Sequence, residues 1–164
     1  MTTAAIHMTG KLEPRESWPA PGDHCPIART FGTIGTKSAL VILREAFYGA
    51  TRYEEFVERT GLSEPAVAAR LRELSDEGLL EKFPYQELGQ RARSAYRLTK
   101  QGSELLPVLV AMMRWGDRWL FPHGARVEVK HTDCGSPVHA MLRCEEGHDV
   151  TLDELDLSQA PRRP

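Results

Sequence analysis

The sequence has no apolar run long enough to cross a membrane. A transmembrane helix needs roughly 18 or more consecutive apolar residues, and no hydrophobic stretch in this chain of 164 residues reaches that length. The first 24 residues also lack the continuous hydrophobic segment of a secretory signal. We therefore expect a cytoplasmic protein that has no membrane partner.

Cysteine is scarce, and the motifs of the common enzyme classes are absent. Three cysteines are an odd number for a chain of cytosolic character, which argues against a disulfide framework and leaves a redox or metal role open. The sequence contains no glycine-rich phosphate loop, nucleophile elbow or HExxH helix. The protein is therefore not expected to be an enzyme.

Neither sign of charge dominates the composition. The chain carries 21 basic and 23 acidic side chains, and its formal net charge is −2. Net charge governs non-specific attraction, whereas binding to nucleic acid needs only a local basic surface that faces the phosphates. A DNA-binding function would therefore require arginines gathered on particular elements.

Turn-forming residues divide the chain into four parts. Residues 1–24 hold several prolines and glycines and are expected to form a flexible arm. Residues 25–122 are expected to form a mainly α (α+β) domain. Residues 123–157 predict a small β-rich C-terminal extension with strands at 127–129 and 139–142, and residues 158–164 a disordered tail.

The first half of the domain begins with two predicted helices. A short helix starts near Cys25 and ends at Gly35. A second helix, from about Thr36 to Tyr48, is apolar on nearly every side. Such a helix belongs in the centre of a core.

The next two predicted helices form a helix-turn-helix. Thr51 and Glu54 have the spacing of a capping box, and the helix that follows ends at Gly61. Ser63 is expected to cap the next helix, with Pro65 in its first turn. A helix, a tight turn with glycine and a second capped helix make the helix-turn-helix arrangement.

Two alternating segments after this motif predict a hairpin. Residues 79–85 and 94–98 alternate apolar and polar side chains, and the polar residues 86–93 would form the tip. A hairpin directly after the second helix of a helix-turn-helix is a wing. The domain is therefore predicted to be a winged helix-turn-helix.

A long helix is expected from Ser103 to Leu120, with Pro107 close to its start, where proline would kink the first turns. Its apolar residues form two adjacent stripes, which are wider than a surface helix needs, so we expect packing on its own domain and on a partner. Packing entirely within the chain is the alternative. The predicted dimer residues are Leu105, Leu109, Met112, Met113, Gly116 and Trp119.

An ordered series of motifs extends over roughly residues 25–120. The motifs are Cys25-Pro-Ile-Ala-Arg29, Ile34-Gly-Thr-Lys37, Leu40-Val-Ile-Leu-Arg-Glu45, Arg52-Tyr-Glu-Glu-Phe56, Leu62-Ser63, Arg70-Leu-Arg-Glu-Leu74, Glu77-Gly-Leu79 and Tyr96-Arg-Leu-Thr-Lys-Gln-Gly102. Together and in this order they resemble HxlR-type regulators of the MarR-like winged-helix superfamily. The resemblance implies a winged-helix repressor that binds an inverted-repeat operator as a homodimer joined through terminal helices. It also implies control by an effector or by cysteine chemistry.

The sequence departs from the family pattern at two places. Ser38 stands where the family usually has tryptophan, and Pro65, Ala68 and Ala69 stand where the recognition helix usually has polar side chains. Few groups on this helix can therefore hydrogen-bond base edges, and we expect shape and phosphate contacts to carry much of the specificity.

The predicted contacts to double-stranded DNA come from the recognition helix and the wing. They are Ser63, Glu64, Pro65, Ala66, Ala69, Arg70, Arg72, Lys82, Arg91 and Arg93. Two other readings stay open. The arginines could form only a solvated surface, or the acidic residues Glu54, Glu55, Glu58 and Glu73 could mark a winged helix that binds protein rather than DNA.

The cysteines and histidines suggest two further sites. Cys25 stands where redox-sensing members of the family carry their reactive cysteine, and the alternative is a small buried side chain. His131, Cys134, Cys144 and His148 form two short ligand pairs that could hold a structural zinc ion. Packed turn residues or a pair between Cys134 and Cys144 are the alternatives.

Overall fold

The computed structural model describes residues 6–10, 25–86 and 93–158. The chain divides into two compact units, one of residues 23–138 and one that joins residues 1–22 to residues 139–164. The first unit holds α1 (Pro26–Ile34), α2 (Lys37–Phe47), α3 (Tyr53–Thr60), α4 (Glu64–Asp76), β2 (Leu80–Tyr85), β3 (Arg93–Leu98), α5 (Lys100–Ser103) and α6 (Leu106–Leu120). The second holds β1 (His7–Met8), a 3-10 turn (Leu152–Glu154) and β4 (Asp156–Leu157).

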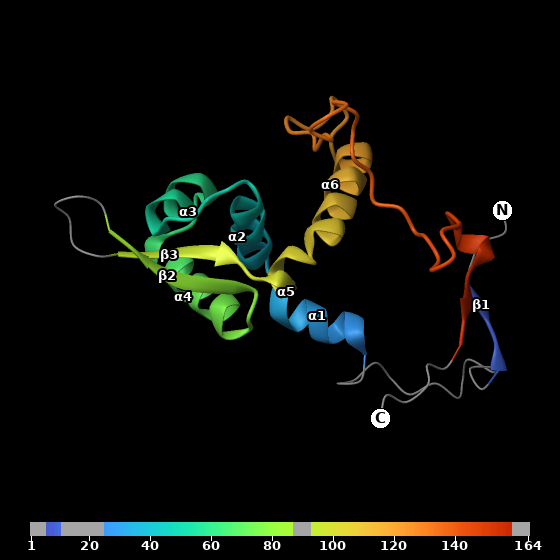
Figure 1. Cartoon of the computed structure of the whole chain (residues 1–164), viewed down its shortest axis with the longest axis horizontal. Helices are drawn as coiled ribbons and strands as arrows, with labels where there is room; N and C mark the ends of the chain where they lie inside the picture. Colours follow the sequence, from blue (N-terminus) through green and yellow to red (C-terminus); the bar gives the residue numbers. More distant parts are fainter. Residues whose placement is uncertain (1–5, 11–24, 87–92, 159–164) are drawn as a thin grey trace. The chain divides into compact units, whose positions relative to one another are not determined.

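Helices α2, α3 and α4 surround the hydrophobic core of the larger unit (Figure 1). Val67, Leu71 and Leu74 of α4 follow one another at spacings of four and three, which places them on one side of the helix. They pack with Ile42 and Phe56 and are almost completely buried. Burial of each such side chain contributes about 1.5–3 kcal/mol, so the inner face of α4 is fixed by the core and its opposite face is left to solvent.

Helix α2 has the bounds that the sequence predicts. The Thr36 hydroxyl accepts a hydrogen bond from the amide of Ala39 at 3.2 Å and caps the helix. Glu45 is the buried charged residue among the core positions, with 5% exposure, and Arg44 neutralises it at 2.5 Å. The central position predicted for α2 is confirmed, because Ala39, Ile42 and Leu43 are all fully buried.

The predicted capping box of α3 is wrong by one residue. Glu55, rather than Glu54, accepts hydrogen bonds from the amides of Thr51 and Arg52, at 2.8 and 2.9 Å. Arg52 is the residue that precedes the helix, and its carbonyl accepts the amide of Glu55. The third helical position is therefore Glu55, which is the position from which a glutamate reaches back to the cap.

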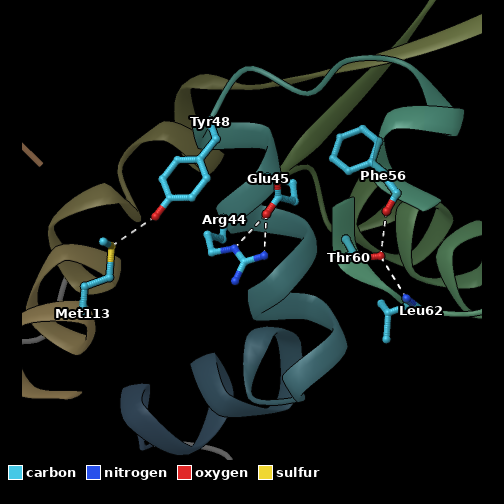
Figure 2. Close-up of polar contacts among 7 residues, drawn as sticks. All are labelled: Arg44, Glu45, Tyr48, Phe56, Thr60, Leu62 and Met113. Atoms are coloured by element: carbon cyan, nitrogen blue, oxygen red, sulfur yellow. Dashed lines mark hydrogen bonds and ion pairs between the residues drawn. The ribbon is translucent and has the colours of Figure 1, made fainter. Parts of the chain in front are cut away.

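The turn between α3 and α4 depends on Gly61, whose φ is +67°, a left-handed conformation that favours glycine. Thr60 reinforces this turn: its hydroxyl donates to the Phe56 carbonyl at 2.6 Å and accepts the Leu62 amide at 3.2 Å (Figure 2). Ser63 holds the capping position of α4, but its side chain makes no capping hydrogen bond. The predicted position is right and the predicted bond is absent.

Strands β2 and β3 form the antiparallel hairpin expected for a wing, with Leu80 opposite Leu98 and Tyr85 opposite Arg93. The amide of Tyr96 donates to the carbonyl of Thr51 at 2.8 Å and attaches the hairpin to the start of α3. Of the predicted tip, residues 86–93, Arg93 is instead the first residue of β3, paired with Tyr85, and residues 87–92 with Arg91 lie outside the described residues. Helix, turn, helix and hairpin follow in the predicted order, and the larger unit is a winged helix-turn-helix.

The long helix expected from Ser103 to Leu120 is found as α6, which starts three residues later, and a short helix that was not predicted, α5, precedes it. Gly102 of α5 lies so close to β2 that a Cβ atom there would be 2.1 Å from the carbonyl oxygen of Leu79. This close approach holds α5 against the hairpin, and α6 begins separately at Leu106. Pro107 lies in the first turn of α6, where a missing amide proton removes no helical hydrogen bond, so it does not kink the helix.

The predicted strands at residues 127–129 and 139–142 do not form. Isolated bridges join Lys130 to Pro137 and Arg143 to Asp149, and each closes a tight turn. The regular pairing of the smaller unit is between β1 and β4, which run parallel. His7 and Met8, which the sequence assigned to a flexible arm, therefore belong to a strand. Among the helices of the described residues, none has the length and apolar character required to cross a bilayer.

Candidate nucleic-acid interface

The outer face of α4 presents most of the residues predicted to contact DNA. Five predicted positions are exposed, and Ala66 is half-buried beside them. The exposed positions are Ser63, Glu64, Pro65, Ala69 and Arg72. They lie opposite the buried residues of α4 because the core fixes the rotation of the helix, so the predicted recognition face is accessible.

Arg70 has a different position from the other α4 residues. It is half-buried and forms an ion pair with Glu73, one turn along the helix. Its Nε atom is buried and has no hydrogen-bond partner among the described residues. Arg70 therefore braces α4 and is not presented to a ligand, as its position near the buried edge suggests.

A surface groove of about 540 Å³ opens between α4 and the hairpin. Arg72 of α4 and Lys82 of β2 both line it. Its other walls carry hydroxyl groups, a small apolar side chain and one carboxylate from α3, α4 and β3, namely Tyr53, Ser75, Tyr96, Ala68 and Asp76. We refer to these seven residues as the α4–wing groove.

The cations of the α4–wing groove differ from the neighbouring arginines in having no counter-ion. In the part of the chain that the structure describes, neither Arg72 nor Lys82 takes part in an ion pair. Arg93 pairs with Glu54 at 2.9 Å and Arg97 pairs with Glu81 at 2.6 Å. The groove thus holds two cations that form no ion pair and one carboxylate, that of Asp76, and the two cations are suited to bind phosphate oxygens.

Two tyrosines at the groove supply neutral hydrogen-bonding groups. The Tyr53 hydroxyl donates to the carbonyl of Glu64 at 2.9 Å, which joins α3 to the start of α4. Burial raises the pKa of Tyr53, and the carboxylates of Glu64 and Glu54 raise it further. Burial also raises the pKa of Tyr96, although the charge of Arg72 opposes this. Both hydroxyls therefore stay protonated at neutral pH.

The sequence alone did not identify Tyr53, Ser75 and Tyr96 as part of this surface. Tyr53 lies in the third predicted helix and Tyr96 in a predicted strand of the wing, and neither was assigned to the DNA surface. Both are half-buried, with the ring packed against the core and the polar edge near the surface. The useful signal would have been that tyrosine commonly places an apolar ring inside and a hydroxyl outside.

Arg52 is a further basic residue near the wing that the sequence did not identify. Its guanidinium carbon lies 5.0 Å from the ring centroid of Tyr85, at the end of β2. This cation–π contact places a positive charge beside the hairpin. Lys82 and Arg93, which were predicted, lie exposed on the two strands of the same hairpin.

The predicted redox residue, Cys25, lies immediately before α1. It is half-buried, and its side chain makes no capping hydrogen bond. Its carbonyl accepts the amide of Arg29 at 3.0 Å. The position at a helix start agrees with the prediction, and the sensitivity of the thiol stays a prediction.

The four predicted metal ligands form two separate pairs. His131 Nδ1 lies 3.3 Å from Cys134 Sγ, and Cys144 Sγ lies 3.6 Å from His148 Nδ1. The first pair belongs to the larger unit and the second to the smaller one. Hydrogen bonds from the Ser136 hydroxyl and backbone lower the pKa of Cys134. Across the described ranges, no group of three or more histidine, cysteine or acidic side chains gathers closely enough to hold a metal ion, and the zinc site stays a prediction.

The predicted dimer residues of α6 have two different environments. Leu105 and Leu109 pack against the core of their own chain, so the alternative of packing within the chain holds for them. Met113 and Gly116 are half-buried, whereas Met112 and Trp119 are exposed. Other large apolar side chains on α1 and α6 are exposed as well, namely Ile27 (71%), Phe31 (63%) and Trp115 (60%).

Comparisons with known proteins agree with this architecture. Residues 33–124 match the model of a family described as HxlR-like helix-turn-helix. The uncharacterized HTH-type transcriptional regulator Rv3095 of Mycobacterium tuberculosis is 34% identical over 137 residues, which cover 82% of this chain and 85% of that protein. The similarly described regulator sll1512 of Synechocystis is 34% identical over 100 residues, 60% of this chain and 73% of that protein.

Two solved structures show the same fold. The candidate transcription factor PA1607 has a TM-score of 0.75 and 34% identity, and the match covers 84% of this chain and 96% of that chain. The redox regulator HypR in its oxidized form has a TM-score of 0.52 and 26% identity, over 57% of this chain and 96% of that chain. The family match includes α2–α6 and the hairpin, and therefore every residue of the α4–wing groove.

Proposed function

This chain belongs to the HxlR-like helix-turn-helix family of transcriptional regulators, and we propose that it is a repressor that binds an inverted-repeat operator as a homodimer. The regulators that it resembles are not enzymes. DNA binding is the function that this family implies. The operator architecture, the dimer and the direction of control go beyond the family and rest on the arguments below.

The observation that carries the proposal is the α4–wing groove. Arg72 and Lys82 come from the recognition helix and the wing, and neither forms an ion pair with a carboxylate of the described residues. In a winged helix these two elements meet the same DNA, the helix in the major groove and the wing at the neighbouring backbone. The two cations therefore lie where phosphates would pass.

Exposed apolar surface supports the homodimer. Ile27 and Phe31 of α1, with Trp115 and Trp119 of α6, are large side chains that are more than half exposed in the single chain. Exposed apolar patches of this kind mark interaction surfaces. A twofold dimer would present two α4 helices to successive major grooves, about 34–36 Å apart, and this spacing requires an inverted repeat.

The test compares the salt dependence of DNA binding between charge variants. Arg72→Ala combined with Lys82→Ala should weaken binding to a duplex from the chain's own promoter region. Each phosphate contact contributes about 0.9 to the slope of log K against log salt. The double variant should therefore lower this slope by about 1.8 per subunit, as measured by fluorescence anisotropy between 50 and 200 mM salt, roughly the range in which this effect is large.

The matched control removes one arginine and one lysine elsewhere. Arg118 and Lys130 are exposed and lie outside α4 and the hairpin. Arg118→Ala combined with Lys130→Ala changes the net charge equally and should leave the slope within error of that of the unchanged protein. An equal loss of slope in both double variants would show that the α4–wing groove has no special role.

The alternative of a winged helix that binds protein rested on acidic residues near α3 and α4. Three of these four carboxylates have partners within the chain: Glu54 with Arg93, Glu55 with Arg59 and two amides, and Glu73 with Arg70. Their charge is thus largely compensated. The acidic residues therefore give little reason to prefer a protein partner to DNA.

A redox response at Cys25 is a separate proposal. The resemblance to the redox regulator HypR and the position of Cys25 before α1 support it. Operator binding should then fall after mild diamide treatment and be retained in Cys25→Ser. Binding that is equally sensitive in both proteins would assign the oxidation to another residue.

A further inference from the structure

A second and larger cavity lies in the same unit, away from the α4–wing groove. It has a volume of about 850 Å³ and lies between the end of α2, one side of α6 and the segment of residues 121–138. This volume is within the range of about 300–1,000 Å³ typical of small-molecule sites. None of the residues of the α4–wing groove lines it.

The wall of the cavity is mainly apolar and is not filled by the chain. Val110 and Met113 of α6 form one side, and Phe121, Val127 and Val129 form another. Phe121 and Val127 are more than half exposed. An apolar body that filled the cavity would remove these surfaces from water, which is favourable in proportion to the area buried.

Two side chains from α2 and its C-terminal end, Tyr48 and Arg44, line the cavity and keep donor capacity that the chain does not fully use. The Tyr48 hydroxyl makes a 3.7 Å contact to the thioether sulfur of Met113 (Figure 2), and a thioether is a weak acceptor. Arg44 directs Nε and Nη2 to one oxygen of Glu45, at 2.8 and 2.5 Å, and its Nη1 makes no hydrogen bond within the described residues. Both side chains line the cavity, so a strong acceptor there would gain two donors.

The charged residues that line the cavity are three arginines and three carboxylates, and they differ in how far they are already hydrogen-bonded. Each lining carboxylate already has a donor: Glu45 binds Arg44, Asp117 accepts the amide of Ala125, and Glu128 lies 3.2 Å from Lys130 and 3.9 Å from Arg114. Arg126 lines the cavity and forms no ion pair with any described residue. The unused hydrogen-bonding capacity is therefore that of cationic and neutral donors.

We propose that this cavity binds a small amphipathic acid, with an aromatic or aliphatic body against Val110, Met113 and Val127 and a carboxylate that accepts from Tyr48, Arg44 and Arg126. A second copy of the chain is the competing occupant. The side of α6 that carries Val110 and Met113 is about half a turn from the side that carries Trp115 and Trp119. The proposed site is thus opposite the two tryptophans. Met112, Met113 and Gly116, which the sequence predicts at the dimer interface, also line the cavity, and measurement of the oligomeric state distinguishes the two occupants.

The test measures binding of phenylbutyrate and octanoate to the full chain by isothermal titration calorimetry and by thermal shift. Phenylbutanol and octanol are the matched neutral probes. We expect the acids to bind at least about tenfold more tightly than the alcohols, because charge-assisted hydrogen bonds are the stronger ones. Binding should also raise the melting temperature, since a ligand of the folded state stabilises it.

Two variants locate the site. Arg126→Gln and Tyr48→Phe should each weaken binding of the acids by about fivefold or more and leave binding of the alcohols unchanged. Arg118→Gln, which removes an exposed arginine of α6 outside the cavity, should change neither. Because binding is measured without DNA, the outcome is independent of the proposed function.

Three results would overturn the proposal. The first is equal affinity for the acids and the alcohols, which would show that the donors of Tyr48, Arg44 and Arg126 do not bind a carboxylate. A second such result is that none of the four probes binds with a dissociation constant below about 1 mM, which is the weak limit for a specific small-molecule site. Arg126→Gln or Tyr48→Phe could instead change the oligomeric state by light scattering, and the cavity would then belong to an interface between copies.

Discussion

Glutamates of the DNA-binding unit act mainly as partners for groups of their own chain. Glu45 is buried against Arg44, Glu54 holds an arginine of the wing, and Glu55 caps α3. A glutamate count near a proposed DNA surface therefore overstates the negative charge that DNA would meet. The relevant quantity is the charge that remains after internal pairing, and on α4 and β2 it is balanced: Arg72 and Lys82 are positive, and Glu64 and Asp76 are negative.

The cap made by Glu55 should depend on pH. Backbone hydrogen bonds from Arg52 and Thr51 lower the pKa of Glu55 in the folded chain, so folding favours its ionised form. This contribution is present above the unfolded pKa of about 4.3 and is lost as the pH falls through the folded value. Glu55→Gln should lower the free energy of unfolding by about 1 kcal/mol at pH 7, and the difference should shrink below pH 4.3.

Urea unfolding at several pH values measures this effect. Glu58→Gln is the matched control, because Glu58 is an exposed glutamate of the same helix and forms no ion pair with the described residues. Its stability should differ little from that of the unchanged chain at any pH. A difference for Glu55→Gln that stays constant between pH 7 and pH 3 would contradict the role of its charge.

The one-residue error at this cap shows what the sequence can and cannot define. Thr51 and Glu54 satisfy the spacing of a capping box, and so does a helix that starts one residue later and uses Glu55. The choice is made by tertiary contacts: the carbonyl of Thr51 accepts the amide of Tyr96 in the wing. A hydrogen bond to a residue 45 positions away cannot be inferred from local spacing.

At the scale of elements, the helix-turn-helix and the wing could be predicted because each has its own local signal. Apolar periodicity defines α2 and α4, Gly61 defines the turn, and alternation defines β2 and β3. Helix α5 and the break between it and α6 were not predicted, because they depend on the close approach of Gly102 to Leu79. The pairing of β1 with β4 was also missed, since two-residue strands at opposite ends of a chain carry no periodic signal.

The wing arginine Arg93 gives a prediction at this scale. It is held by Glu54 of α3, so binding to a phosphate requires exchange of one anion for another. Glu54→Gln should release Arg93, strengthen DNA binding and raise the salt slope by up to about 0.9 per subunit. Glu58→Gln removes the same charge from α3 without releasing an arginine and should have a smaller effect. Equal effects in salt titrations of the two variants would show that Arg93 does not contact DNA.

For the whole molecule, the exposed apolar side chains of α1 and α6 predict the oligomeric state. Trp115→Glu combined with Trp119→Glu should convert the protein to an 18.4-kDa monomer, because charges would then lie in the buried surface. Analytical ultracentrifugation measures the mass. Met141→Glu, at an equally exposed apolar residue of the smaller unit, should leave the dimer intact. A double variant that keeps the mass of the unchanged protein would place the interface elsewhere.

Selection from a random duplex library by the purified, unmodified protein tests the central claim most directly. Two α4 helices related by a twofold axis should enrich an inverted repeat whose half-sites are centred about 10 base pairs apart, and binding to it should weaken steeply as salt increases. The α4–wing groove would then account for the phosphate contacts. Recovery of no common sequence, with binding that is weak and equal for every duplex, would contradict the assignment of this chain as an operator-binding dimer.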